Sequence, residues 1–142
     1  MKYKFMMKRI ILTLLVAFMS SSFVQAQNEP SINKKNLVVK EWNTNSKGGA
    51  SVLDHITTYS ADGKKVEEIE YDINGKQKWR KRYEWSANGT MSRELVYDER
   101  NRLVNYKKFE YNEFGKKKAQ YTYDANGKLI STKIIEYVAE DA

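Results

Sequence analysis

The sequence predicts an all-β protein, built as an antiparallel meander of about eight strands. Two observations predict this fold. Aromatic residues recur at spacings that alternate between 12 and 14 residues: Tyr59, Tyr71, Trp85, Tyr97, Tyr111, Tyr123 and Tyr137. Each of the first six is followed by a five-residue turn sequence, such as DINGK at 72–76 and DANGK at 124–128. Asn-Gly or Asp-Gly between alternating strands is a strong hairpin pattern, and consecutive hairpins form a meander.

The turn sequences predict hairpins with three-residue loops. Apolar residues keep odd numbers on both sides of each turn, and directly opposed residues share a face, so opposed numbers must sum to an even value. This places Asp72 opposite Lys76 and predicts a type I turn followed by a G1 bulge, with Gly75 at positive φ. Asn101 takes the glycine position of the fourth turn.

These turns also predict cross-strand ion pairs on the outer surface, Asp72–Lys76 and Asp124–Lys128. An alternative is a calcium loop, because Asp72 and Asn74 resemble the start of such a loop. A calcium loop needs more oxygen ligands, and Lys76 stands where another one is required. A plain turn is therefore favoured.

We expect strands near residues 37–42, 51–59, 64–71, 76–85, 90–97, 102–111, 116–123 and 128–137. Since every spacing is even, the recurring aromatics are all predicted to point to one face of the sheet. The same parity predicts the opposed pairs Ile69–Trp79, Trp79–Tyr97, Trp85–Met91 and Phe109–Ala119. We expect an open or partly rolled single sheet. The alternative is a closed eight-stranded up-and-down barrel, which would enclose the charges near the strand centres at a large cost.

Charged residues are predicted near the middle of the aromatic face: Glu67, Lys81, Arg93, Lys107 and Lys133, with Glu67 opposite Lys81. The even-numbered residues are predicted to form a solvated outer face. A mostly basic band bordered by aromatic rings suits a glycan or an anionic envelope ligand. The candidate ligand-binding residues are Trp79, Lys81, Trp85, Arg93 and Lys107. In the alternative interpretation the long side chains only lie across neighbouring rings while their charges reach solvent.

The N-terminus has the pattern of a signal peptide at 1–26, with a basic start, an apolar run and a small residue, Ala26, at the cleavage position. A flexible lead-in at 27–35 and one β domain at 36–142 follow. The leader contains four of the 25 basic residues and none of the 18 acidic ones, so its removal lowers the net charge from +7 to +3. We therefore expect an exported protein that binds no nucleic acid and has no transmembrane segment after cleavage.

The Y-D-x-N-G-K sequences at 71–76 and 123–128 resemble the tyrosine–aspartate repeats of large bacterial toxin shells. As a whole, the chain is similar to a family of small secreted proteins from Bacteroidetes. The resemblance covers residues 51–137 and implies strand–turn architecture and a periplasmic or secreted protein of a Gram-negative bacterium. It implies no activity and assigns no catalytic residue.

No catalytic, metal-binding or cofactor-binding constellation is predicted. The sequence has one histidine, His55, and no cysteine. His55 is predicted to pack opposite Ile69, and an active site needs an asymmetric cluster of groups that this pattern lacks. The expected function is a non-enzymatic binding module. The alternative is a structural or protein-interaction element whose aromatic face is buried in a homo-oligomer or against a partner.

Overall fold

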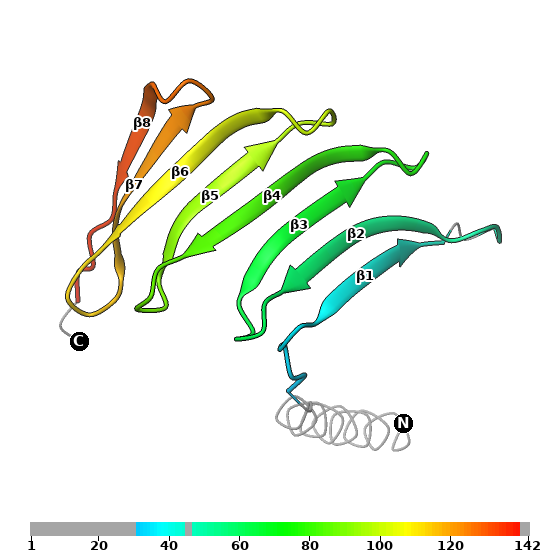
Figure 1. Cartoon of the computed structure of the whole chain (residues 1–142), viewed down its shortest axis with the longest axis horizontal. Coiled ribbons are helices and arrows are strands. Elements are labelled where there is room, and N and C mark those ends of the chain that lie inside the picture. Colours follow the sequence, from blue (N-terminus) through cyan, green and yellow to red (C-terminus); the bar gives the residue numbers. More distant parts are fainter. Residues whose placement is uncertain (1–30, 45–46, 140–142) are drawn as a thin grey trace, which may run out of the picture. The chain divides into compact units, whose positions relative to one another are not determined.

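The computed structural model describes residues 31–44 and 47–139, which form one open antiparallel sheet of eight strands in chain order (Figure 1). The strands are β1 (Val38–Asn43), β2 (Val52–Tyr59), β3 (Lys65–Tyr71), β4 (Gln77–Trp85), β5 (Met91–Tyr97), β6 (Leu103–Tyr111), β7 (Lys117–Asp124) and β8 (Leu129–Ile134). In this part of the chain β1 and β8 do not pair, so the open meander is confirmed and the closed barrel is wrong. The predicted leader, 1–26, lies outside the described residues.

Strand positions agree with the sequence prediction to within about two residues, except that β8 ends at Ile134 rather than at 137. Pairing with β7 continues slightly further, because the Ile135 N–H donates to the Lys118 carbonyl at 3.0 Å. Throughout the described ranges, no helix is long and apolar enough to cross a membrane.

The predicted turn geometry is confirmed. In the hairpin between β3 and β4 the Gly75 N–H donates to Asp72 O at 2.9 Å, and the Asp72 N–H donates to Lys76 O at 2.8 Å. Gly75 has φ +75°, and Asn101 adopts φ +59° at the equivalent position. The ion pair predicted for Asp72 is wrong within the described structure, because its carboxylate accepts the backbone N–H groups of Asn74 and Lys76 instead. Asp124 does the same with Asn126 and Lys128.

Each of these hairpins contains a second bulge that the sequence analysis did not predict. Near the turn, Tyr71 lies opposite Gln77 as parity requires, but Glu70 then lies opposite Trp79, so Lys78 is an extra residue. The same one-residue shift in register occurs immediately before Tyr59, Trp85, Tyr97, Tyr111 and Tyr123. A bulge places two residues of one strand against one of its partner. Beyond it, odd-numbered residues face even-numbered ones.

The second bulge overturns the predicted face assignment. Ile69 lies opposite Arg80 and not Trp79, Tyr97 lies opposite Arg80 and not Trp79, and Phe109 lies opposite Gln120 and not Ala119. Similarly, Glu67 lies opposite Arg82 and not Lys81, and His55 lies opposite Glu70 and not Ile69. Only the pair next to a turn, Trp85–Met91, is confirmed. The recurring aromatics therefore alternate between the two faces, and the prediction of one aromatic face and one solvated face is wrong.

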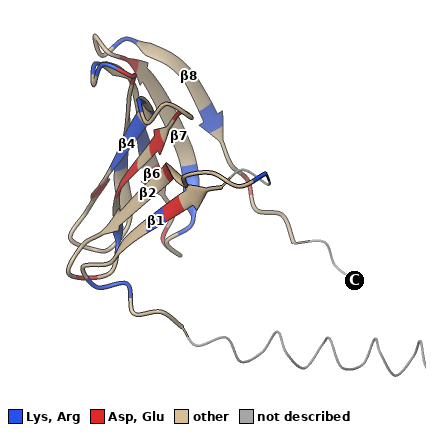
Figure 2. Ribbon diagram, turned by 90° about the vertical axis from the view of Figure 1, so that its right-hand side faces the viewer, with Lys and Arg blue, Asp and Glu red and all other residues tan. Residues whose placement is uncertain are grey.

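Two faces can be defined from the opposed pairs. The Trp79 face carries His55, Glu68, Glu70, Trp79, Lys81, Tyr83, Glu94, Lys107, Phe109 and Lys133. The Tyr106 face carries Ile69, Arg80, Arg82, Glu84, Arg93, Leu95, Tyr97, Tyr106, Lys108, Tyr121 and Tyr123. Basic and acidic residues are interspersed over the strands (Figure 2).

The sheet is a single layer with a thin core. Among the described residues only Tyr83, Leu95 and Ala119 have an exposed fraction below a tenth, and no large side chain is fully buried. Cohesion comes from cross-strand pairs and from cations over aromatic rings, such as Arg80 at 4.6 Å from the Tyr97 ring centroid. Three side chains also donate a hydrogen bond to a carbonyl at the start of the preceding strand: Trp85 to Lys65 O, Tyr111 to Met91 O and Tyr137 to Lys117 O.

Candidate functional site

The central part of the Trp79 face brings together an aromatic and polar cluster from β2, β3 and β4. The rings of His55 and Trp79 meet edge-on, with centroids 5.7 Å apart and planes at 71°. Lys81 Nζ lies 4.7 Å from the centroid of the Trp79 ring. Lys81 follows Trp79 by two residues on β4, so strand alternation places both on the same face. We call His55, Glu68, Glu70, Trp79, Lys81 and Tyr83 the Trp79 site.

Glu68 is the most strongly bonded carboxylate of this site. Its Oε1 accepts a hydrogen bond from Lys65 Nζ at 2.7 Å, and its Oε2 accepts one from the Tyr83 hydroxyl. Burial alone would raise the pKa of Glu68, but these two hydrogen bonds outweigh it and hold the pKa below the usual value. Burial and the adjacent Glu68 carboxylate raise the pKa of Tyr83. Tyr83 is therefore a fixed hydrogen-bond donor over the neutral pH range.

The cations predicted to bind an anion on this face lie beside carboxylates. Lys81 is opposed by Glu68, and Lys107 Nζ makes an ion pair with Glu94 Oε1 at 2.8 Å. The carboxylate of Glu70 is also held by Lys78. Carboxylates thus lie beside both Lys81 and Lys107, and the predicted, mostly basic band is interrupted by acidic residues.

Trp85 lies on the Trp79 face near the end of β4. Its Nε1–H donates to the Lys65 carbonyl at 2.8 Å, and Lys64 Nζ lies 5.6 Å from the centroid of its ring. The indole N–H is thus already used in holding β4 to β3. Trp85 contributes apolar ring surface but no free donor to a ligand.

Arg93 lies on the opposite face from the other four predicted site residues. It is opposed by Glu84 and Lys108, its guanidinium is 5.0 Å from the Tyr106 ring centroid, and Nη1 is 3.4 Å from Glu84 Oε2. Tyr106 in turn stacks on Tyr123 at a centroid distance of 5.0 Å. Arg93 therefore belongs to a separate cation–aromatic cluster and does not meet a ligand bound at Trp79.

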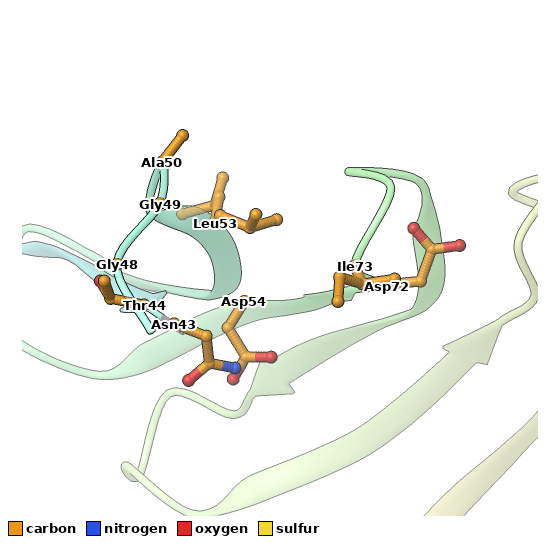
Figure 3. A pocket seen from close by; sticks show the side chains of 10 residues that line it. Asn43, Thr44, Gly48, Gly49, Ala50, Leu53, Asp54, Asp72 and Ile73 are labelled. Carbon is orange, nitrogen blue, oxygen red and sulfur yellow. The ribbon is translucent and has the colours of Figure 1, made fainter. Parts of the chain in front are cut away.

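A shallow hollow lies at one end of the sheet, between the β1–β2 loop and the β3–β4 turn (Figure 3). Its volume is about 570 Å³, and its lining includes Thr44, Gly49, Leu53, Asp54 and Ile73. None of the predicted site residues lines it. Within the described ranges no group of three or more His, Cys, Asp or Glu side chains could hold a metal ion.

Sequence reasoning found Trp79, Lys81, Trp85 and Lys107 on one face but missed the acidic residues beside them. Glu68, Glu70 and Glu94 have even numbers, and parity assigned them to the other surface. The sequence offers a retrospective indication in Tyr83, because a tyrosine at a strand centre needs a partner for its hydroxyl when buried.

Comparisons with known proteins give little further information. No protein-family model matches the chain, and no curated protein matches it. One solved structure with a distant likeness is described as accessory secretory protein 1, 2 and 3 in Streptococcus pneumoniae, at 16% identity and a TM-score of 0.33. The alignment covers 80% of this chain but only 22% of that one. A likeness of this size carries no argument about function.

Proposed function

We propose that the protein is an exported, non-enzymatic binding element that holds a neutral glycan on the Trp79 face. The observation that carries the proposal is the Trp79 ring on an uncovered sheet face, bordered by Glu68, Glu70 and His55. Aromatic rings offer large rigid contact surfaces, and adjacent carboxylates can accept hydrogen bonds from sugar hydroxyls. Export rests on the predicted leader, which lies outside the described residues.

A neutral ligand is favoured over an anionic one because of charge balance. Lys107 is paired with Glu94, and Glu68 lies opposite Lys81, so an anion that approaches either of these two cations would meet a carboxylate. In the free protein the Lys81 ammonium covers the Trp79 ring. A sugar stacking on that ring would displace it, at the cost of a cation–π contact worth about 0.5–1 kcal/mol at an exposed site.

The test is a glycan-array screen followed by titration of the best neutral oligosaccharide. We expect Trp79→Ala to lower its affinity at least about tenfold, whereas Phe114→Ala, at an exposed turn, leaves it unchanged. Lys81→Ala should preserve or strengthen binding, because it uncovers the ring. Loss of binding in Lys81→Ala together with a strong salt dependence would identify an anionic ligand instead. Equal affinity of wild type and Trp79→Ala would refute this site.

A second candidate is an interaction element whose face is covered by another protein. The observation that favours it is the thin core, with Tyr83, Leu95 and Ala119 as the most buried apolar residues described. In that case Trp79→Ala should lower the sedimentation coefficient of the purified protein. A change confined to glycan affinity would argue for the first candidate.

A further inference from the structure

We propose that copies of this protein associate head to tail, with β8 of one copy pairing antiparallel to β1 of the next. The inference concerns the two edges of the sheet and does not depend on the ligand proposed for the Trp79 face. Strand order runs from β1 to β8, so one edge of each of these strands has no strand partner in the described structure (Figure 1). Unpaired edges are templates for pairing with another chain.

The backbone groups that point away from the sheet can be identified on both edges. On β1 the Leu37 carbonyl accepts the Tyr59 N–H, and on β8 the Ile135 N–H donates to Lys118 O. In antiparallel pairing the backbone groups of alternate residues point to opposite sides. Even-numbered residues of β1, such as Lys40, and of β8, such as Thr132, therefore present free N–H and C=O groups outward.

The regular segments of β8 and β1, together with the charges on these two edges, select one register. On β8 the regular pairing with β7 begins after the extra residue Ile130 and continues to Ile135, so the regular segment runs from 131 to 135. On β1 the regular segment runs from 37 to 43. The bulge in this pair of strands is on β2, where Asp54 is the extra residue, so β1 itself is not interrupted. Placing residue 131 opposite 43 pairs the whole β8 segment within the β1 segment, and the same register continued past Ile135 places residue 137 opposite 37. In this register the odd-numbered residues of β8 oppose the odd-numbered residues of β1. Both sets lie on the Trp79 face, so each face continues from one copy to the next.

This register brings together complementary side chains. On the Trp79 face Lys133 lies opposite Glu41 of the next copy, Ile135 opposite Val39 and Tyr137 opposite Leu37. In Figure 2 the ribbon of β8 carries a basic segment and that of β1 an acidic one. Neither Lys133 nor Glu41 makes an ion pair within the described part of one chain. Among the apolar partners, Tyr137 is 59% exposed, and Leu37, Val39 and Ile135 are partly exposed.

The opposite face is also matched. Thr132 lies opposite Trp42, Ile134 opposite Lys40 and Glu136 opposite Val38, with Glu136 diagonal to Lys40. Trp42 and Ile134 are 56% and 65% exposed in the single chain, and pairing would cover both.

Self-pairing of either edge is less favourable. Lys40 and Glu41 are neighbours on β1, so two β1 strands cannot place them opposite each other while keeping the faces aligned. Two β8 strands could pair Lys128 with Glu136 only across the bulge at Ile130. The β8–β1 contact is heterologous, so it builds an open series or a ring rather than a twofold dimer.

Charge reversal tests the register in solution. For protein purified after expression of the full-length chain, sedimentation velocity should show concentration-dependent species beyond a dimer, or one ring. Lys133→Glu and Glu41→Lys should each weaken association about three- to tenfold, since each sets like charges opposite. The double variant Lys133→Glu/Glu41→Lys should restore it. Lys116→Glu, the same charge change at an exposed turn, should have no effect.

Cysteine cross-linking provides the decisive measurement, because the chain has no cysteine of its own. Val39 and Ile135 would form a non-hydrogen-bonded pair with Cα atoms about 4.5 Å apart, within disulfide range. Oxidation of a mixture of Val39→Cys and Ile135→Cys proteins should give a mixed dimer. The mixture of Val39→Cys with Ile134→Cys, which faces the other way, should not.

Each alternative outcome contradicts the proposal. A disulfide dimer of Val39→Cys alone would show that β1 pairs with itself, and one of Ile135→Cys alone would show the same for β8. A monomer at all concentrations up to about 1 mM would show that the edges do not associate. None of these results bears on the glycan proposal, because Trp79 lies on neither edge.

Discussion

Tyr83 and Glu68 show how one hydrogen bond stabilises a sheet that has almost no core. Tyr83 is among the few side chains described that are less than a tenth exposed, and its hydroxyl donates to a carboxylate of the neighbouring strand. Lys65 donates to the same carboxylate and lies 5.2 Å from the centroid of the Tyr83 ring. Three side chains from β3 and β4 thus form a closed set of contacts on the Trp79 face.

Replacing Tyr83 with Phe removes the donor and keeps the ring. Hydrogen bonds to charged groups contribute about 1.5–3 kcal/mol, and with partial exposure we expect a loss of about 1–2 kcal/mol in urea unfolding at pH 7. Because the pKa of Glu68 is lowered in the folded state, its stabilisation is present above the unfolded pKa and is lost as pH falls through the folded value. The difference between Tyr83→Phe and wild type should therefore shrink at acid pH. A pH-independent difference would mean that packing, not the carboxylate, sets the cost.

The hairpin is the element that sets both the regularity and the errors of prediction. Each turn ends with a residue at positive φ and is followed three residues later by an extra strand residue, such as Lys78 after Gly75. The first bulge lies in the turn and lets the chain reverse direction. The second adds one residue to the next strand, so odd-numbered residues there lie on the face that carried even-numbered residues in the strand before. The recurring aromatics therefore point to opposite faces in successive hairpins.

Gly75 offers a clean test of the first bulge. A Cβ placed there would meet no atom within 4 Å, so any cost of substitution comes from the backbone conformation alone. We expect Gly75→Val to lower the free energy of unfolding by more than about 1 kcal/mol, since a β-branched residue fits positive φ poorly. Gly75→Asn should cost less, as Asn101 already adopts this conformation. Equal thermal melts for the two variants would contradict the turn assignment.

The sequence predicted the strands and turns because Gly, Asn and Asp have specific roles in turns. It predicted an open sheet because a closed barrel would enclose the charges near the strand centres. It did not predict the second bulge, because such a bulge requires no special residue: the extra position holds Lys78 in one hairpin and Val104 in another. Parity therefore failed beyond the turns. It correctly predicted Trp79 and Lys81 on the same face. It wrongly assigned Arg93 to the Trp79 face and Glu68 to the opposite one.

At the scale of the whole molecule, a single layer with two exposed edges depends on its surroundings for stability. Large apolar side chains at the C-terminal end, including Ile130, Ile134, Tyr137 and Val138, are more than half exposed. A folded single layer gains little from apolar burial, so a neighbouring copy at each edge would contribute a large share of the total.

Association through the edges predicts that the melting temperature depends on concentration. Binding that involves only the folded state stabilises it by mass action. We expect the melting temperature of the wild type to rise by several degrees over a hundredfold increase in concentration. Lys40→Pro removes an N–H that points away from β2 and should abolish this rise while preserving the sheet at low concentration. A concentration-dependent melt that persists in Lys40→Pro would place the contact elsewhere.

The hydrogen bonds from Trp85, Tyr111 and Tyr137 each reach back 20 residues and recur every 26 residues along the chain. A segment of that length holds two strands and two turns, and it restores both the strand direction and the facing side. Excision of residues 86–111 would join Trp85 directly to the turn that begins at Asn112, and every remaining side chain would keep its face of the sheet. During evolution the protein can therefore lengthen or shorten in steps of one such segment. The loss of a single strand, by contrast, would reverse the direction of every later strand.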